Sequence, residues 1–313
     1  MNESFLAALR VVIPMIILMS VGYLMRATNK ITRPAMKEFD RIIFLVFMPV
    51  LLFKNIYDMD FSQGFALKEI IFAAVCLLVV FIIAYYVPRV FVKDGNKSSV
   101  IGQAVGRCNY ILYGIAVSEA LYGEGNSKMV VMLAVLVIPA INTFSAVILE
   151  LNRSGRTSPG KLFIAILRNP MIIASLLAFA LNLSGVKIPV PIWSAIKSLA
   201  NSTTTVSFIS LGVGLEMLES KSDRMPLLLG IILRMLIVPL IFMPISILAG
   251  FRNESLCAMM IIFASPSAVA SYPMAIAMGA DGKLAGQLVC ITTLLSVLTI
   301  FLWTFILRTL GLM

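Results

Sequence analysis

The sequence predicts an all-α polytopic membrane protein with ten transmembrane helices, and two observations carry this prediction. The chain has 313 residues, of which 60% are hydrophobic and 13% charged, with a mean hydropathy of +1.00. A soluble protein carries about 25% charged residues, so this chain has too few to cover a globular surface. Its apolar residues form runs of about 20 residues, rather than the segments of about 10 alternating residues typical of a membrane β-barrel.

Ten stretches are long and apolar enough to cross the hydrocarbon core as helices. Their approximate limits are 5–25, 39–57, 69–90, 98–121, 129–150, 163–183, 191–217, 225–249, 254–278 and 284–309. The second is the weakest, because its uncharged centre runs only from Ile42 to Phe53. The first ten residues have no basic leader and no cleavage site, so we expect them to begin helix 1.

Lysine and arginine are distributed unequally between the two sets of loops. Sixteen lie in or near the loops that follow odd-numbered spans and eight lie on the opposite side, and the bias survives removal of Arg234, which lies within a span. Cytoplasmic loops are enriched in these residues. We therefore expect a multi-pass protein of the inner (plasma) membrane, with both termini outside.

A polar connection divides the ten spans into two sets of five. We predict an N-terminal five-helix repeat at 1–150, a cytoplasmic connecting loop at 151–161 and a C-terminal repeat at 162–313. An odd number of spans in each half inverts the second half relative to the first. A weak internal similarity agrees, because Tyr113–Gly123 aligns with Tyr272–Gly282 at an offset of 159 positions.

The fourth span of each half contains residues that interrupt helices. Span 4 has Gly102, Gly106 and Gly114 with polar Gln103, Arg107, Asn109 and Tyr113, and span 9 has Ser265, Pro266, Ser267, Ser271 and Pro273. Proline within a helix costs about 3 kcal/mol, and lipid offers no water to the freed backbone groups. Ser265 and Pro266 also have the pattern of an N-cap and first-turn pair, so a half-helix is expected to begin there. Small residues also serve close helix packing, but two interruptions at equivalent places favour a site at the bilayer midplane.

Five segments resemble the auxin efflux carrier family of plants and bacteria, within the bile acid, arsenite and riboflavin transporter superfamily. They are FMPVLLF (47–53), GRCNYILYGIAVSEALYGE (106–124), RNPMIIASLLAFALNLSGVKIP (168–189), ISLGVGLEM (209–217) and ASPSAVASYPMAIAMGADGKLAGQ (264–287), in family order along the chain. The resemblance implies two inverted five-helix repeats, with helices 4 and 9 broken and crossing at the bilayer midplane. It also implies transport of small organic anions, which are auxin in plants and mostly carboxylates such as malate or malonate in bacteria.

The resemblance also assigns candidate substrate-binding residues. The asparagine of the family's fourth-helix motif falls on Asn109 and the glycine of its crossing on Gly114. The proline that usually follows this glycine is Ala116 here, and Cys108 and Tyr110 replace a glycine and a threonine, so span 4 is expected to be less sharply broken. The full set of expected substrate-binding residues is Arg107, Asn109, Tyr113, Gly114, Ser265, Pro266, Ser267, Ser271 and Pro273.

The residues agree with an anionic substrate. A broken helix presents orphan N–H groups and the positive end of its dipole. Arg107 either adds positive charge near a carboxylate or extends to the cytoplasm, and Arg234 either serves transport or pairs with Glu216. No acidic residue lies clearly at the midplane, which weakens an argument for a sodium site or a proton relay.

The function expected is a secondary transporter, a permease or efflux carrier that works by alternating access. Sodium- or proton-coupled symport of organic anions is the alternative. A channel needs a filter motif that is absent, and an enzyme is not expected because there is no histidine and there are few buried acids. The four cysteines lie in apolar runs without CxxC spacing, so we expect no metal and no cofactor. The expected partners are the organic anion and the lipid bilayer, with a homodimer left open and no nucleic acid; substrate, direction and coupling ion also stay open.

Overall fold

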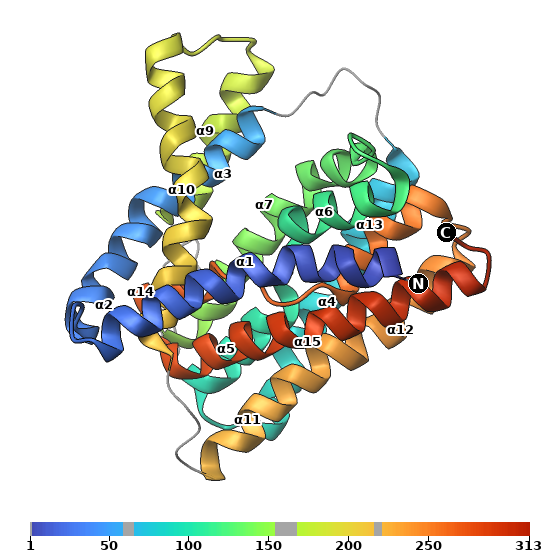
Figure 1. Cartoon of the computed structure of the whole chain (residues 1–313). Coiled ribbons are helices and arrows are strands. Elements are labelled where there is room, and N and C mark those ends of the chain that lie inside the picture. The colour runs from blue at the N-terminus through green and yellow to red at the C-terminus, as the bar shows by residue number, and fades with distance from the viewer. Residues whose placement is uncertain (1, 59–65, 154–167, 216–220) are drawn as a thin grey trace.

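The computed structural model describes residues 2–58, 66–153, 168–215 and 221–313, and the regular elements in these ranges are all helices (Figure 1). They are α1 (Asn2–Ala27), α2 (Arg33–Ile42), η1 (Ile43–Phe47), α3 (Met48–Tyr57), α4 (Leu67–Phe91), α5 (Gly95–Gly106), α6 (Tyr110–Tyr122), α7 (Lys128–Arg153), α9 (Pro170–Leu183), α10 (Val190–Gly214), α11 (Lys221–Ile232), η3 (Leu233–Ile237), α12 (Val238–Leu248), α13 (Asn253–Ala264), α14 (Ser271–Ala277) and α15 (Gly282–Thr309). Most of the predicted connecting loop, and Glu216, lie outside the described residues.

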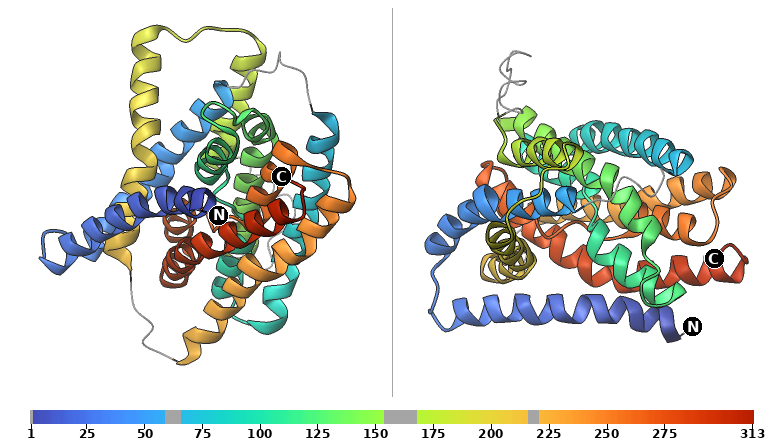
Figure 2. Two further views of the ribbon diagram at one scale, coloured as in Figure 1. Left: turned by 45° about the vertical axis from the view of Figure 1, so that its right-hand side comes forward. Right: turned by 90° about the horizontal axis from the view of Figure 1, so that it is seen from above.

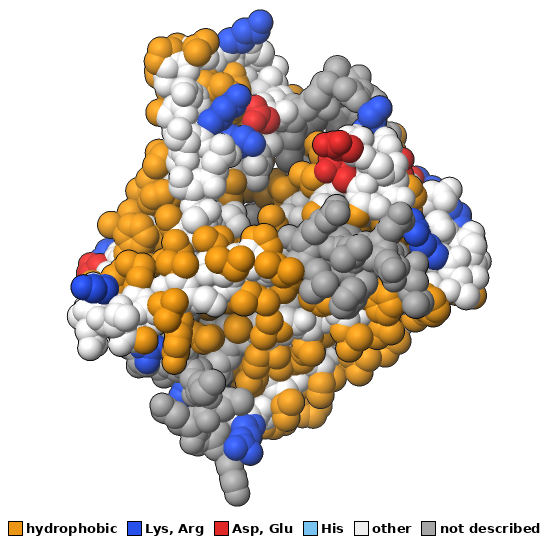
Figure 3. Space-filling view, in the orientation of Figure 1, with side chains coloured by type: hydrophobic (Ala, Val, Ile, Leu, Met, Phe, Trp, Pro, Cys, Tyr) orange, Lys and Arg blue, Asp and Glu red, His pale blue; other side chains and the backbone are white. Residues whose placement is uncertain are grey.

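Several helices have the length and composition of membrane spans. Four of those described are long and apolar enough to cross a bilayer, namely Leu67–Phe91, Lys128–Leu151, Arg224–Leu248 and Gly282–Thr309. Large apolar side chains on them are exposed, with Leu248 at 86% and Val90 at 74%. Hydrophobic side chains cover the middle of the face in Figure 3, while Lys and Arg gather near its edges. Such a surface is suited to lipid rather than water.

Two spans contain a five-residue π-helix that precedes a proline. Residues 33–57 form one continuous helix, longer than the predicted span 39–57, in which η1 is followed by Pro49. Residues 221–248 form the other, in which η3 is followed by Pro239. A π-turn shifts the register of the backbone bonds and is frequent at functional sites. The hydroxyl of Thr203 donates to the carbonyl of Phe47 at 3.0 Å, which satisfies one displaced group of η1.

Helices α1 and α10 are in close backbone contact. In Figures 1 and 2, α1 runs across α10. A glycine of each helix faces the backbone of the other helix. A Cβ on Gly212 would lie 2.0 Å from the carbonyl oxygen of Met19, and a Cβ on Gly22 would lie 2.0 Å from that of Ile209. These distances leave no room for a side chain, so glycine sets the separation of the two helices.

The helices of the second half follow the spacing of the first. Moved along the chain by 159 positions, α4 would cover 226–250 and α7 would cover 287–312, which are nearly the ranges of α11 to α12 and of α15. The same shift moves residues 33–57 to 192–216, which is nearly the range of α10. The offset that aligns Tyr113 with Tyr272 therefore also aligns other helices of the first half with helices of the second half.

Candidate functional site

Both predicted interruptions are present. The helix of the fourth span stops at Gly106 and α6 begins at Tyr110, so three residues separate α5 from α6. In the ninth span six residues separate α13, which ends at Ala264, from α14, which begins at Ser271. The interruption in span 4 is therefore the shorter of the two. Ser271 and Pro273 lie within α14, after the gap.

The expectation that a half-helix begins at Ser265 and Pro266 is wrong. Ser265 is the C-cap of α13, with extended backbone and its N–H donated to the carbonyl of Ile261 at 3.3 Å. The residues after it are not free to start a helix, because their backbone groups bond to the other interrupted span. The next helix begins only at Ser271, with Ala270 as its N-cap.

The two interruptions pair with each other through a short antiparallel bridge between Cys108 and Ser267. The N–H of Asn109 donates to the carbonyl of Pro266 at 2.9 Å, and the N–H of Ala268 donates to that of Arg107 at 3.0 Å. Cys108 and Ser267 are 159 positions apart. The same offset relates Asn109 to Ala268 and Arg107 to Pro266, so the two hydrogen bonds are equivalent under it. The crossing therefore has an approximate two-fold relation in sequence.

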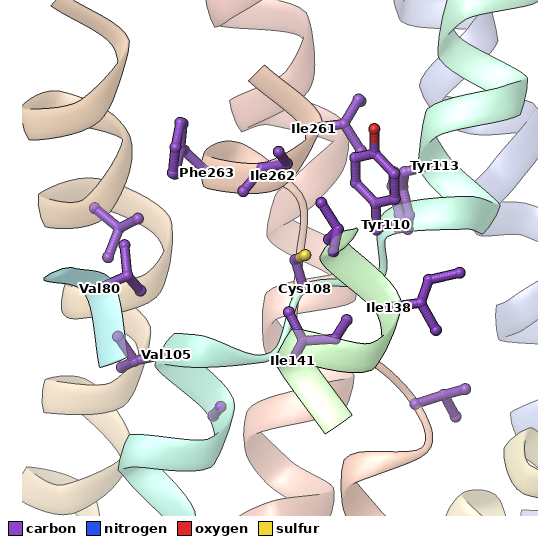
Figure 4. Close-up of a cluster of buried hydrophobic side chains, with 14 of the residues drawn as sticks. Val80, Val105, Cys108, Tyr110, Tyr113, Ile138, Ile141, Ile261, Ile262 and Phe263 are labelled. Atoms are coloured by element: carbon purple, nitrogen blue, oxygen red, sulfur yellow. The ribbon is translucent and has the colours of Figure 1, made fainter. Parts of the chain in front are cut away.

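Apolar side chains surround one side of the crossing. Figure 4 shows Cys108 among side chains of α7 and α13, including Ile141 and Ile262. Ser267 is held firmly, because its Oγ donates to the carbonyl of Ala104 at 2.7 Å and its N–H donates to Oγ1 of Thr292 at 3.2 Å. The bridge is thus buried and rigidly supported rather than open to lipid.

Several polar side chains at or near the crossing have atoms that lack a hydrogen-bond partner within the described structure. They are Nδ2 of Asn109, Nε of Arg107, Oη of Tyr110 and Oγ of Ser265 and Ser271. A buried polar atom without a partner costs free energy. These atoms are therefore the groups from which a polar ligand would gain most.

Three other predicted site residues have packing roles here. Tyr113 is fully buried and its hydroxyl is 2.7 Å from Oγ of Ser296 on α15. A Cβ on Gly114 would lie 2.4 Å from the side chain of Val130, so this glycine permits close packing of α6 on α7. Pro273 is buried within α14.

Arg107 does not extend to the cytoplasm, so that alternative is wrong. Its side chain is 3% exposed. Nη2 donates to Oδ1 of Asn142 at 2.6 Å, and Nη1 donates to the carbonyl of Ala270 at 3.2 Å and to Sδ of Met274 at 3.0 Å. The guanidinium therefore joins the first interruption to α7 and to α14.

Arg234, which projects from η3, joins the ends of both interrupted helices. It is 1% exposed, and its guanidinium donates to three backbone carbonyls. Nη1 donates to Val105 at the end of α5, at 3.0 Å. Nη2 donates to Ile262 at 3.0 Å, and Nε donates to Ser265 at 2.8 Å. The last carbonyls of a helix have no partner within it, and their negative dipole end favours a cation.

A cavity that the sequence did not reveal lies beside α14. Its volume is about 370 Å³, and its walls come from α2, the end of α10, α14 and the start of α15. It contains Asp40, which is 1% exposed and is the one buried acidic residue among those whose side chains the structure describes. No sequence pattern indicated the cavity, because Lys37 and Arg41 make this segment resemble the edge of a basic loop.

Comparison with known proteins identifies the family of this chain. A family described as membrane transport protein matches residues 7–304, nearly the whole chain. An uncharacterized transporter of Methanothermobacter thermautotrophicus is 23% identical over 307 residues, covering 97% of this chain and 99% of its own length. The uncharacterized transporters MJ1031 of Methanocaldococcus jannaschii and YfdV of Escherichia coli K12 are 24% and 22% identical, covering 95% of this chain and 98% and 96% of their own lengths. The chain belongs to the membrane transport protein family, the auxin efflux carrier family that its sequence resembles.

Proposed function

We propose that this protein is a secondary transporter of small organic anions, such as carboxylates or auxin-like weak acids, that works by alternating access around the crossing. The observation that carries the proposal is the paired interruption at Cys108 and Ser267, with two buried guanidinium groups beside it. Discontinuous helices that meet in this way form the substrate sites of many secondary transporters.

The charges around the crossing favour an anion. Arg107 and Arg234 are both buried, and their described hydrogen bonds go to carbonyls, an amide oxygen and a thioether rather than to a carboxylate. Hydrogen bonds of this kind satisfy most of the N–H donors, with Nε of Arg107 as an exception, but leave the positive charge uncompensated. Arg234 binds the C-terminal ends of α5 and α13, where the helix dipoles are negative. The N-terminal end of α6, at Asn109, is the positive end of its dipole and favours an anion.

Ten spans in two inverted repeats fit this proposal. The 159-position offset relates the helices of the two halves and exchanges the two hydrogen bonds of the crossing. The start of α1 and the end of the chain lie on the same side in Figures 1 and 2, as an even number of spans requires. The distribution of Lys and Arg supports placing both termini outside the inner membrane, with the cavity beside α14 on the cytoplasmic side.

Counterflow in proteoliposomes tests the proposal. Vesicles preloaded with unlabelled organic acid are expected to accumulate the same labelled acid transiently, which a channel does not do. Malonate, malate, succinate and indole-3-acetate form the first panel, chosen beforehand by the thermal shift that each produces in the purified protein. Saturable counterflow of any member that requires the protein supports an organic anion carrier. Thermal stabilisation and counterflow only with cationic or neutral solutes would overturn it.

A further inference from the structure

Asp40 is a buried carboxyl group at the wall of the cavity beside α14. It lies on α2 near the start of the π-helical segment, and it is 1% exposed. Its Oδ1 accepts a hydrogen bond from the hydroxyl of Ser210 on α10. A neutral hydroxyl does not compensate a full charge, and an ionised carboxylate taken out of water without such compensation is costly. In membrane segments, carboxyl groups that face a cavity commonly mark proton pathways.

The other charged groups at this cavity come from two helices. Lys37 lies one turn before Asp40 on α2, and Lys283, which also lines the cavity, lies at the start of α15. Of the elements that pack against α2, α14 contributes the buried Tyr272, while the described cavity residues of α10, Val213 and Gly214, have no charge. The residues of η1 are apolar. Asp40 is therefore the one anionic group within the described wall of a cavity that two ammonium groups also line.

The end of α10 is fixed in place at this cavity. Nη1 of Arg26 donates to the carbonyls of Val213 at 3.1 Å and Leu215 at 2.9 Å. On the other wall, the hydroxyl of Tyr272 approaches α10 so closely that a Cβ on Gly214 would lie 1.6 Å from it. Asp40 thus shares the cavity with a firmly capped helix end and a tightly fitted tyrosine.

The same short helix connects the cavity with the crossing. Tyr272 lies one residue after the start of α14, and the guanidinium of Arg107 bonds to Ala270 before it and Met274 after it. A change of charge at the cavity wall therefore acts on a helix that the crossing also holds.

We propose that Asp40 is a proton-binding site that opens to this cavity, and that its protonation controls access of the anion from this side. When Asp40 is the neutral carboxylic acid, the charged side chains among the described wall residues are Lys37 and Lys283, and positive groups at the wall attract an anion. The ionised carboxylate offsets this lining and repels an anion in a medium of low dielectric constant. The second part of the proposal rests on the proposed function, whereas proton binding at Asp40 does not.

Infrared titration of the full chain in lipid tests proton binding directly. A protonated carboxylic acid has a carbonyl band separate from that of a carboxylate. The difference between wild type and Asp40→Asn is expected to contain this band at low pH and to lose it as the pH rises. Asp58→Asn is the control, because Asp58 is exposed and pairs with Lys54 at 3.5 Å, and it is expected to leave that titration unchanged. If Asp40→Asn does not fold, Asp40→Glu is expected to shift the same band. A difference spectrum that does not titrate would overturn the proposal.

Flux tests the link to transport. At each cavity-side pH, labelled malonate flux is compared between Asp40→Asn and wild type, so that the titration of malonate itself cancels. The ratio of mutant to wild-type flux is expected to rise with pH, by up to about tenfold per pH unit for one proton. A ratio that is independent of pH would overturn control by Asp40. If neither protein moves malonate while the infrared band still titrates, the result contradicts malonate as a substrate. Asp40 then remains a proton-binding site.

Discussion

Nη1 of Arg234 donates to the carbonyl oxygen of Val105 at 3.0 Å, although the two residues lie in different halves of the chain. The same guanidinium donates to the carbonyl of Ser265 from Nε at 2.8 Å. One side chain therefore connects the last turn of α5 with the C-cap of α13. Because it binds both helix ends at the crossing, it holds the two interrupted spans together.

Replacement of Arg234 by Gln is expected to weaken folding and to abolish transport. The shorter amide cannot reach three carbonyls, and leaving buried acceptors unsatisfied costs about 1–3 kcal/mol each. Arg234→Lys keeps the charge without the planar fork, so we expect an intermediate melting temperature. Thermal melting in detergent together with counterflow measures both effects. Arg224→Gln, at an exposed arginine of α11, is the control and should behave like wild type. Equal stability of Arg234→Gln and the control would show that Arg234 does not hold the crossing together.

Asn109→Ala is expected to abolish transport and to leave expression and thermal stability nearly unchanged. Its Nδ2 has no hydrogen-bond partner in the described structure, whereas its backbone N–H bond to Pro266 is retained by alanine. The side chain is therefore available to a substrate and contributes little to folding. Counterflow and melting are measured in parallel, with the exposed Asn126→Ala as control. An interhelical hydrogen bond would instead contribute about 0.6–2 kcal/mol, so loss of folding with activity would assign Asn109 a structural role.

The interruptions were predictable from sequence because their cause is local. Pro266 cannot continue a helix, and polar residues around Asn109 stood at bilayer depth. The carbonyl partners of Arg234 were not predictable, because backbone groups have no signature in the sequence. The position of Asp40 depends on how α2 lies against α10 and α14, which no local pattern contains. Where α14 begins was also missed, because backbone pairing across the crossing overrode the capping preference of Ser265.

Gly212→Ala is expected to destabilise the protein even though alanine favours helix formation. Alanine gains about 1 kcal/mol over glycine in helix propensity. A Cβ at this position would lie 2.0 Å from the carbonyl oxygen of Met19, so α1 and α10 would have to separate. Overpacking of this kind typically costs about 1–3 kcal/mol. Melting temperatures in detergent compare it with Ser202→Ala on the exposed face of α10. A melting temperature for Gly212→Ala at or above that of the control would show that the contact is loose.

Single cysteines at Ser158 and Asn126 are expected to react with a membrane-impermeant reagent from opposite sides, in a background without the four native cysteines. Asn126 follows α6, on the side proposed to be outside. Ser158 belongs to the predicted connecting loop, outside the described residues, and is expected in the cytoplasm. Labelling in intact cells and in inverted vesicles distinguishes the sides. Labelling of both positions in intact cells would contradict the five-plus-five arrangement.

Transport is expected to depend on membrane potential and to proceed without sodium. The buried charges at the crossing, Arg107 and Arg234, are positive, and the described ranges contain no cluster of three or more acidic, cysteine or histidine side chains able to hold a metal ion. A carrier that moves one net negative charge gains about 2.3 kcal/mol per 100 mV, so a negative interior favours export. Malonate flux in proteoliposomes under imposed potassium diffusion potentials, with sodium and the pH on the side away from the cavity varied separately, measures this dependence. The pH on the cavity side is held constant, so that protonation of Asp40 does not change with the potential. Flux that ignores the potential and stops without sodium would instead indicate a sodium-coupled mechanism.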